Sequence, residues 1–444
     1  MRIEIRDKEN FIKMFNNLFE KDKINKVNGV CIDSRKIKQN DIYIPIKGKK
    51  YDGHDFIIKA LKNGAIKCLS EKNNKDKDII KIKSSIEAIN TMASIWNKKS
   101  KHKIIGITGS NGKTTTKELI YNILSTQNSC SKSIGNYNSK IGLPISYLNT
   151  FLNDEYCILE YGASKPGEIK SLCEIIKPHI AVITNIGNAH IKNYSSIKNI
   201  YNTKKAIFQC LNNKDIAFIN LDDKHISSSC DFSCKKIFYS SKKTANYKAE
   251  FNNNKSIFKI NNKKFKLNND LKHLIDIILP AYSICAELGI SHNAINKSIN
   301  TYSLEKGRGK SILIDGIEII DDSYNANPSS VLLAINRLNS IVNITGKKVF
   351  VLGDMLELGN KSINEHKKIG DYFNKTNINI IITYGNKTFH THESVSNKKI
   401  KKYHFNKMEE LRNHLKENIK NGDLIYLKGS RSMQLEKIYE TGLA

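Results

Sequence analysis

This chain of 444 residues contains no run of 18 apolar residues, so we expect no membrane-spanning helix. Proline and glycine are scarce, at 6 and 24 residues, while 39% of the residues are hydrophobic. These values exclude collagen-like repetition and wholesale disorder, and they provide enough apolar material for folded cores. The N-terminal stretch MRIEIRDKENFIKMF is charged and amphipathic, unlike a signal peptide, so we expect a cytoplasmic protein.

Cysteine is present at nine positions, but no two cysteines form a CxxC pair. The closest spacing, Cys230 and Cys234, lacks the neighbouring His or Cys that a zinc site needs. Several others, such as Cys157 in EYCILEYG, lie in apolar runs that are typical of small core residues. The pattern favours free thiols in a reducing compartment.

Arginine is rare, with seven residues against 65 lysines, although the formal net charge is +29. A surplus of this size is typical of proteins that bind nucleic acid or an anionic membrane. Nucleic-acid-binding proteins, however, tend to use arginine for bidentate contacts to phosphate and guanine. Here lysine is spread along the chain with Ile and Asn, as in FNNNKSIFKINNKKFK. We interpret the surplus as a bias toward lysine codons and expect no nucleic-acid partner, with a basic binding surface as the alternative.

Strand-like and helix-like segments alternate along most of the chain. Apolar runs such as YCILEYG, IAVITNIG and DIAFIN are separated by helical patterns such as KELIYNILSTQ, in which Leu119, Ile120, Ile123 and Leu124 share one face. This alternation predicts an α/β fold of mostly parallel sheets wrapped by helices, interrupted by exposed hairpins over 236–268. The chain length and a second αβ series after the GRG segment predict three domains. We expect a small N-terminal α/β domain over 1–83, a central phosphate-loop domain over 84–310 and a Rossmann-like domain over 311–444.

The sharpest motif is GITGSNGKTTTKEL, in which a strand, a glycine loop, Lys-Thr and a helix follow one another. Gly109 and Gly112 would let backbone N–H groups close around phosphate oxygens. Lys113 would supply a charge for the β- and γ-phosphates, and Thr114 a hydroxyl for Mg²⁺. The helix that follows directs its positive dipole end at the same anion. Ile107 replaces the first glycine of the longer loop motif, and the shorter GxxGKT form predicts binding of ATP with Mg²⁺.

Two polar residues end apolar strands that would flank this loop. Glu160 ends YCILE, and His190 ends IAVITNIGNAH. Because the carboxyl ends of parallel strands meet at the nucleotide loop, both side chains would lie beside the phosphates. A carboxylate there can bind Mg²⁺ together with Thr114, and an imidazole can bind a second metal or a phosphate. For His190, a helix cap or a core histidine is the alternative.

The chain resembles the Mur ligase family, and most closely its D-alanyl-D-alanine-adding branch, in the motifs TGSNGKTTTKE, GNYNSKIGLP, LEYGASKPGEI, TNIGNAH, DDSYNANPSS, GDMLELG and LKGSRS. The N-terminal IDSRKI and DIYIPIKGKKYDGHDF resemble the UDP-sugar domain of that family. The resemblance implies an ATP- and Mg²⁺-dependent amide ligase of peptidoglycan synthesis. Such an enzyme joins D-Ala-D-Ala to the carboxylate of a UDP-N-acetylmuramoyl (UDP-MurNAc) tripeptide through an acyl phosphate.

The resemblance also assigns roles to residues. Arg308 matches a linker arginine that reaches the phosphates, and Lys204 matches a lysine that carries a carbamate and helps to hold a second Mg²⁺. Lys428 and Ser430 are expected to face the same cleft. The residues expected to bind the nucleotide are Thr108, Gly109, Ser110, Asn111, Gly112, Lys113, Thr114, Asn220, Asp322, Asn325 and Asn327. Those expected to bind the sugar nucleotide are Asp33, Ser34 and Arg35. The expected metal ligands are Thr114, Glu160 and His190, and the expected catalytic residues are Lys113, His190, Lys204 and Arg308.

Two segments depart from the family pattern. In KKAIF, Ala206 replaces the usual Glu, and Lys205 is adjacent to the expected carbamate lysine, so the identity of the carbamate site stays open. In LKHLIDIILPAYSICAELG, Leu274 and Asp276 fall near the expected asparagines, and Pro280 is expected to interrupt the helix. These changes leave the contacts to adenine open.

Other functions remain as alternatives. A sibling ligase that adds a dibasic third residue typically carries a DNPR motif, which does not occur here. Folylpolyglutamate synthase shares the loop, but the IDSRKI segment argues against it. A nucleic-acid-stimulated ATPase would use the basic surface with stacking aromatics, and a degenerate ligase kept as a scaffold would fit the departures but not the intact TGSNGKTT. The third tripeptide residue (L-lysine or meso-diaminopimelate) stays open, and a monomer is expected.

Overall fold

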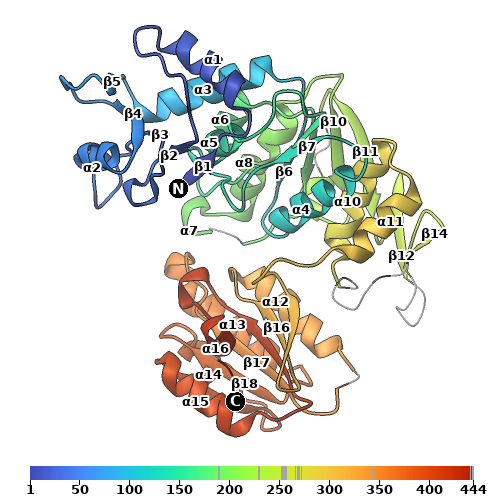
Figure 1. Cartoon of the computed structure of the whole chain (residues 1–444). Coiled ribbons are helices and arrows are strands. Elements are labelled where there is room, and N and C mark those ends of the chain that lie inside the picture. The colour runs from blue at the N-terminus through green and yellow to red at the C-terminus, as the bar shows by residue number, and fades with distance from the viewer. Residues whose placement is uncertain are drawn as a thin grey trace.

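The computed structural model describes residues 1–188, 191–228, 231–251, 258–265, 267, 271, 273–342, 344–440 and 442. Over these residues the strands form three separate sheets, which follow one another along the chain (Figure 1). The predicted three-domain α/β architecture is confirmed. No helix in the described part of the chain is long and apolar enough to cross a bilayer.

The N-terminal sheet has five strands in the order β1-β2-β3-β4-β5. Its first pair is antiparallel and the others are parallel. The helix that leads into the central domain begins after Ser84, whose side chain accepts a hydrogen bond from the Glu87 N–H. The elements are β1 (Arg2–Glu4), α1 (Lys8–Leu18), β2 (Gly29–Cys31), η1 (Ser34–Lys36), β3 (Asp41–Tyr43), η2 (Gly53–Phe56), α2 (Ile57–Lys62), β4 (Ala65–Ser70), β5 (Ile79–Lys81) and α3 (Ser85–Lys99).

The central sheet has nine strands in the order β14-β13-β12-β11-β10-β9-β6-β8-β7, and β6 lies in its interior. Pairing is parallel from β7 to β12, as the apolar runs predicted, and antiparallel only for β12-β13 and β13-β14. The strands are β6 (Lys103–Thr108), β7 (Cys130–Lys132), β8 (Tyr156–Glu160), β9 (Ile180–Ile183), β10 (Ile216–Asn220), β11 (Lys235–Ser240), β12 (Tyr247–Phe251), β13 (Phe258–Ile260) and β14 (Lys263–Phe265).

Helices cover both faces of this sheet (Figure 1). In α4 the predicted face of Leu119, Ile120, Ile123 and Leu124 is buried, and α4 packs against α10. The helices are α4 (Lys113–Leu124), α5 (Gly142–Tyr147), α6 (Glu168–Ile175), α7 (Ile191–Tyr194), α8 (Ile197–Gln209), α9 (Lys224–Ser227), α10 (Ile275–Glu287) and α11 (His292–Thr301).

Two local predictions for the central domain are wrong. The segment 236–268 is not made of exposed hairpins alone, because β11 joins β10 in parallel and buries Ile237 and Tyr239. Pro280 does not interrupt α10, which continues through it. Proline removes one hydrogen bond from a helix, but Ile278 and Ile284 are fully buried in the core on which α10 packs. Tertiary packing therefore outweighs the local preference.

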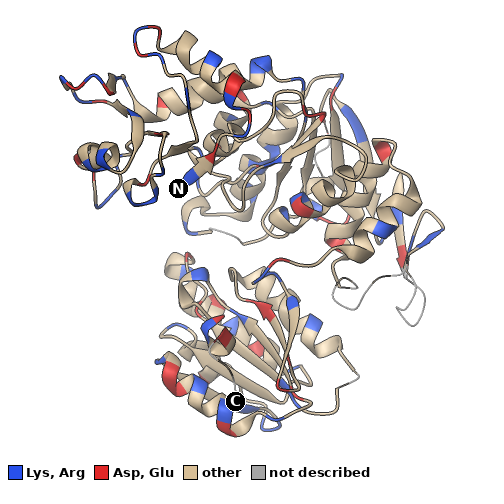
Figure 2. Ribbon diagram, in the orientation of Figure 1, with Lys and Arg blue, Asp and Glu red and all other residues tan. Residues whose placement is uncertain are grey.

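The C-terminal sheet has six strands in the order β15-β16-β20-β17-β18-β19. The first pair is antiparallel and the rest are parallel. Figure 2 shows Lys and Arg over all three domains, interspersed with Asp and Glu. The elements are β15 (Lys310–Ile314), β16 (Ile317–Asp322), α12 (Pro328–Ser340), β17 (Lys348–Gly353), η3 (Gly359–Lys361), α13 (Ser362–Phe373), β18 (Ile380–Tyr384), α14 (Phe389–Ser394), β19 (Lys401–Phe405), α15 (Met408–Asn418), β20 (Leu424–Lys428), η4 (Arg431–Met433) and α16 (Lys437–Glu440).

Candidate active site

The glycine loop lies between the end of β6 and the start of α4, at the carboxyl edge of the central sheet. Gly109 has φ +149° and Gly112 has φ +78°, both values that favour glycine. A Cβ on Gly109 would also collide with the Thr184 hydroxyl on the neighbouring strand end. The loop is further tied down by the Asn111 N–H, which donates to Asn185 Oδ1 at 3.0 Å. Both glycines are therefore needed for this backbone path.

Lys113 begins α4 and folds back over the loop. Its ammonium donates to the carbonyl oxygens of Gly109 at 3.0 Å and Ser110 at 3.4 Å. Burial lowers the pKa of Lys113, and the Glu160 carboxylate opposes this effect. The charge therefore lies where the loop amides and the helix N-terminus would receive a phosphate.

Thr114 and Glu160 meet beside Lys113. The Thr114 hydroxyl donates to Glu160 Oε2 at 2.6 Å, and the Asn138 amide donates to Glu160 Oε1 at 2.7 Å. The Glu160 backbone N–H donates to Ser133 Oγ at 3.1 Å, and the Glu160 side chain is 2% exposed. A buried carboxylate and a hydroxyl held at hydrogen-bonding distance form the oxygen donor set that suits Mg²⁺.

Arg308 reaches the loop from the segment between the second and third sheets. One of its Nη atoms donates to Thr114 Oγ1 at 3.0 Å, and its guanidinium lies 3.6 Å from the centre of the Tyr324 ring. Arg308 Nε and the Thr108 hydroxyl are buried and have no hydrogen-bond partner in the described part of the chain. Because buried polar atoms are normally paired, these two atoms fit a site that bound phosphate groups complete.

Lys204, on α8, points into the same region. Its side chain is 4% exposed, and among the described residues it forms no hydrogen bond or ion pair. Burial, followed by repulsion from Lys113, lowers its pKa to about 7, while Glu160 opposes the shift. The adjacent Lys205 instead lies over the Phe232 ring at 5.3 Å. Three basic side chains thus lie near one carboxylate, and even with Lys204 neutral the charges of Lys113 and Arg308 exceed that of Glu160, which suits a polyphosphate.

The C-terminal domain contacts the loop through the start of α12. Asn327 caps this helix by accepting from the Ser330 N–H at 3.0 Å. Its amide also donates to Asn111 Oδ1 at 2.8 Å, and the Asn111 amide donates to Ser329 Oγ at 3.0 Å. One residue therefore both begins α12 and joins the third domain to the nucleotide loop.

Other expected nucleotide residues have their own protein partners. Asp322 pairs with Lys428, whose Nζ lies 2.7 Å from Asp322 Oδ2. Asn325 is exposed, and its side chain accepts from the Ala326 N–H at 2.9 Å. Asn220 donates to the Thr184 carbonyl at 2.8 Å. The hydrogen bonds and ion pairs of these side chains do not include the loop residues.

The remaining expected residues are distributed as follows. Asp33 caps η1 and forms a bidentate ion pair with Arg35, which holds the pKa of Asp33 at about 2. The Arg35 side chain is 81% exposed, whereas Ser34 is buried. Ser430 accepts from the Leu356 N–H at 2.9 Å. His190 lies outside the described residues.

Sequence reasoning missed two residues that hold the site. Asn138 donates a hydrogen bond to Glu160 Oε1, and it lies within the motif GNYNSKIGLP, which predicted the segment but not this residue. Tyr324 lies under Arg308, and it stands inside DDSYNANPSS. In both cases the motif pointed to the right segment, but only the folded chain shows which side chain makes the contact.

The chain is similar to known proteins over most of its length. Three family models match the chain: the catalytic domain of the Mur ligase family over 26–102, the Mur ligase middle domain over 107–281, and the Mur ligase glutamate ligase domain over 307–431. The chain is 33% identical to the UDP-N-acetylmuramoyl-tripeptide–D-alanyl-D-alanine ligase of Bacillus subtilis, over 93% of this chain and 92% of that protein. It is 34% identical to the enzyme of the same name from Rickettsia prowazekii, over 93% and 94%.

Solved structures give the same result. The fold is similar to that of the MurF ligase of Thermotoga maritima in complex with ADP, with a TM-score of 0.81 and 28% identity over 93% of this chain and 96% of that one. A MurF structure from Acinetobacter baumannii has a TM-score of 0.86 at 24% identity, over 97% and 98%. Because its sequence identity is only 24%, the Acinetobacter baumannii structure supports the fold assignment alone.

Proposed function

The chain belongs to the Mur ligase family, and on that premise we propose that it joins D-alanyl-D-alanine to the terminal carboxylate of a UDP-MurNAc tripeptide in an ATP-dependent reaction. The observation that carries the proposal is the likeness, over 93% of the chain, to the UDP-N-acetylmuramoyl-tripeptide–D-alanyl-D-alanine ligase of Bacillus subtilis. The product would be the pentapeptide precursor of peptidoglycan. The protein would thus act in the cytoplasm, in cell-wall biogenesis, cell shape and division.

The chemistry requires an activated carboxylate. The tripeptide carboxylate attacks the γ-phosphate of ATP, giving an acyl phosphate and ADP, and the amine of D-Ala-D-Ala then displaces phosphate through a tetrahedral intermediate. Two anions must approach in the first step, so positive charge near both of them lowers the barrier. Lys113 and Arg308 supply that charge at the loop, and Arg308 is held in place by Tyr324.

Thr114 and Glu160 would hold Mg²⁺, which when bound would neutralise phosphate charge and align the γ-phosphate. Support comes from the donor set itself, two oxygens fixed by Asn138 and the start of α4. His190 remains in the proposed metal set on the family resemblance.

We assign the carbamate to Lys204 rather than to Lys205. Lys204 is a buried residue whose side chain forms no hydrogen bond or ion pair with the other described residues, and an amine must be neutral to add to CO₂. The neutral amine forms an N–C bond to CO₂ and releases one proton, which leaves an anionic carbamate beside the metal site. The pKa of about 7 supports a neutral amine at physiological pH.

The wider site would extend into all three domains. We propose that 1–83 binds the sugar nucleotide through Asp33, Ser34 and Arg35, that 84–310 binds ATP, and that 311–444 closes over it with Asp322, Asn325 and Asn327. Asn220 would contribute on the adenine side. The protein would act as a monomer without nucleic acid.

The proposal is tested with the purified chain, ATP, Mg²⁺ and a panel of acceptors. We expect phosphate release only when UDP-MurNAc tripeptide and D-Ala-D-Ala are both present, with a new product whose mass is the sum of the two substrates less one water. Tripeptides that end in L-lysine and in meso-diaminopimelate are compared, because the third residue is not assigned. Hydrolysis that RNA stimulates and D-Ala-D-Ala does not affect would overturn the proposal.

A further inference from the structure

Two cysteines of the central domain line the same pocket. Cys173 lies on α6 and Cys210 caps the C-terminus of α8, and these helices pack against each other. The two thiols are close enough to shift each other's pKa, and the Cys210 thiol donates to the Ile207 carbonyl at 3.0 Å. Both line a pocket of about 390 Å³, together with Lys170 and Lys177. Cys173 is buried, whereas Cys210 is half-buried and can be reached from that pocket.

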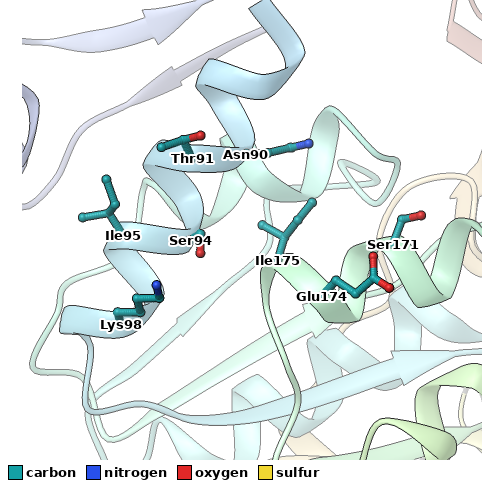
Figure 3. A pocket seen from close by; sticks show the side chains of 8 residues that line it. All are labelled: Asn90, Thr91, Ser94, Ile95, Lys98, Ser171, Glu174 and Ile175. Atoms are coloured by element: carbon teal, nitrogen blue, oxygen red, sulfur yellow. The ribbon is translucent and has the colours of Figure 1, made fainter. Parts of the chain in front are cut away.

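The other flank of α6 differs in chemistry. There α3 and α6 border a second, open pocket of about 430 Å³, shown in Figure 3, which is lined by hydroxyl, amide and aliphatic side chains with Lys98. Glu174 lines both pockets. Ser171, on α6 and two positions before Cys173, is one of the residues that line this second pocket (Figure 3). It contains no thiol, so the two flanks provide a natural comparison.

Cys210 also differs from the other described cysteines in its electrostatic surroundings. Its pKa is lowered, mainly by the neighbouring Cys173 thiol and also by the nearby Lys177 ammonium, although burial opposes the shift. Lys177 is itself held by Asp215 at 3.2 Å. The pKa values of Cys31, Cys68, Cys130, Cys157, Cys173, Cys234 and Cys285 are all raised.

We propose that Cys173 and Cys210 form a redox-active thiol pair, which a hydroperoxide closes to a disulfide that joins α6 to α8. The Cys210 thiolate attacks one peroxide oxygen, the O–O bond breaks, and the leaving oxygen departs as hydroxide or alkoxide and takes up a proton. Sulfur is oxidised by two electrons to a sulfenic acid. The Cys173 sulfur then attacks the Cys210 sulfur, and its proton leaves with the sulfenic hydroxyl as water. A small thiol reverses the reaction by exchange. This proposal does not depend on the ligase function.

The test uses the full chain, folded and reduced, with hydrogen peroxide in small excess. Remaining thiols are blocked with iodoacetamide in denaturant, and peptides are mapped by mass spectrometry. We expect a linked peptide containing Cys173 and Cys210, which dithiothreitol removes. Cys130 is the internal control, because it is also half-buried but its pKa is raised instead of lowered. Its oxidation is expected to be at least about tenfold slower than that of Cys210, since thiolate is the reactive form.

Variants test whether the oxidation of Cys210 to a disulfide depends on Cys173 or only on the exposure of Cys210. In Cys173→Ser, Cys210 is expected to stop at the sulfenic acid and to be trapped by dimedone; in Cys210→Ser, Cys173 is expected to stay reduced. Cys173→Ser combined with Ser171→Cys moves the thiol to the other flank of α6 and should abolish the linked peptide. Thermal unfolding verifies that each variant is folded. A wild-type protein that stays unlinked, or that oxidises Cys130 as fast as Cys210, overturns the proposal.

Discussion

The Thr114 hydroxyl donates a 2.6 Å hydrogen bond to Glu160 Oε2, although the two residues lie 46 positions apart in the chain. Thr114 stands in the first turn of α4 and Glu160 ends β8, the strand next to β6. Parallel pairing brings the ends of these strands to one edge, so both oxygens face the site of the phosphates. This pair defines where a divalent cation would bind, and it has a direct test.

Replacing Glu160 with Gln keeps the shape of the side chain and removes its charge. The Thr114 hydroxyl can still donate to the amide oxygen, and the Asn138 side chain has to turn so that its oxygen accepts from the new NH₂ group, so we expect only a small loss in Tm. Mg²⁺ loses an anionic ligand, and the ligase rate at saturating ATP should fall by about a hundredfold or more, since metal stabilisation is worth several kcal/mol. A Mg²⁺ titration of the rate should also shift to higher concentration. An unchanged titration would rule out Glu160 as a ligand.

Replacing Lys113 with Ala should remove phosphate release that depends on both substrates. The loss of one charge that stabilises the transferring phosphoryl group is expected to lower kcat by about a hundredfold or more. The fold should persist, because the Lys113 ammonium bonds only to carbonyls of its own loop among the described residues. Lys99→Ala, at the exposed end of α3, is the matched control and should behave as wild type. Equal losses in both variants would contradict the assignment.

The two roles of Asn327, as the cap of α12 and as a hydrogen-bond donor to Asn111, can be separated by substitution. Asn327→Asp keeps the oxygen that accepts from the Ser330 N–H, but it loses the amide that donates to Asn111. An Asp is also favourable at a helix N-terminus, so Tm should be preserved. The KM for ATP should rise, by about tenfold, because losing a buried hydrogen bond costs about 1 to 1.5 kcal/mol. Asn327→Ala removes the cap as well, and should lower stability by about 0.5–2 kcal/mol. If Asn327→Asp leaves KM unchanged, the interdomain contact does not assist ATP binding.

The sequence predicted the phosphate loop and the parallel sheet because both depend on local patterns. Glycines before Lys113 specify a backbone path, and uniformly apolar strands specify a buried sheet. The contacts of Asn138 and Tyr324 could not be predicted in the same way. Asn138 is 22 positions from Glu160, and Tyr324 stacks on a residue in a linker. Such contacts depend on how elements are placed in space, which no short-range pattern encodes.

The dependence on tertiary packing also explains why the predictions for Pro280 and for the segment 236–268 were wrong. Pro280 is a strong local signal for a helix end, yet packing of Ile278 and Ile284 in the core keeps α10 continuous. Lys and Asn around β11 suggested an exposed hairpin, but alternate residues Ile237 and Tyr239 are buried where β11 pairs with β10. In a chain with 65 lysines, the presence of lysine does not distinguish an exposed strand from a buried one, because lysine also occurs within the buried elements.

Replacing Lys204 with Ala should abolish activity and be rescued by small acids. The variant lacks the amine that would carry the carbamate, and acetate or formate can place a carboxylate in the space that the side chain leaves. We expect a loss of about a hundredfold or more, partly restored by millimolar acid. Lys205→Ala, the neighbouring residue, is the control and should keep most of its activity. Full activity of unrescued Lys204→Ala would reject the carbamate.

His366 should make the protein less stable as the pH falls below about 6.5. Its ring is fully buried; Nε2 accepts from the Met355 N–H at 3.2 Å, and Nδ1–H donates to the Ser362 carbonyl at 2.7 Å. Burial lowers its pKa, so the unfolded chain binds the proton more readily than the folded one. Stability is therefore fully present above the unfolded pKa and is lost below it, by up to about 1.4 kcal/mol per pH unit. His366→Gln keeps an acceptor and a donor without titrating, so its unfolding free energy should fall less than that of wild type between pH 6.5 and 5. The difference between the two proteins should be constant above pH 7.5, and curves that stay parallel down to pH 5 would show that His366 does not titrate on unfolding.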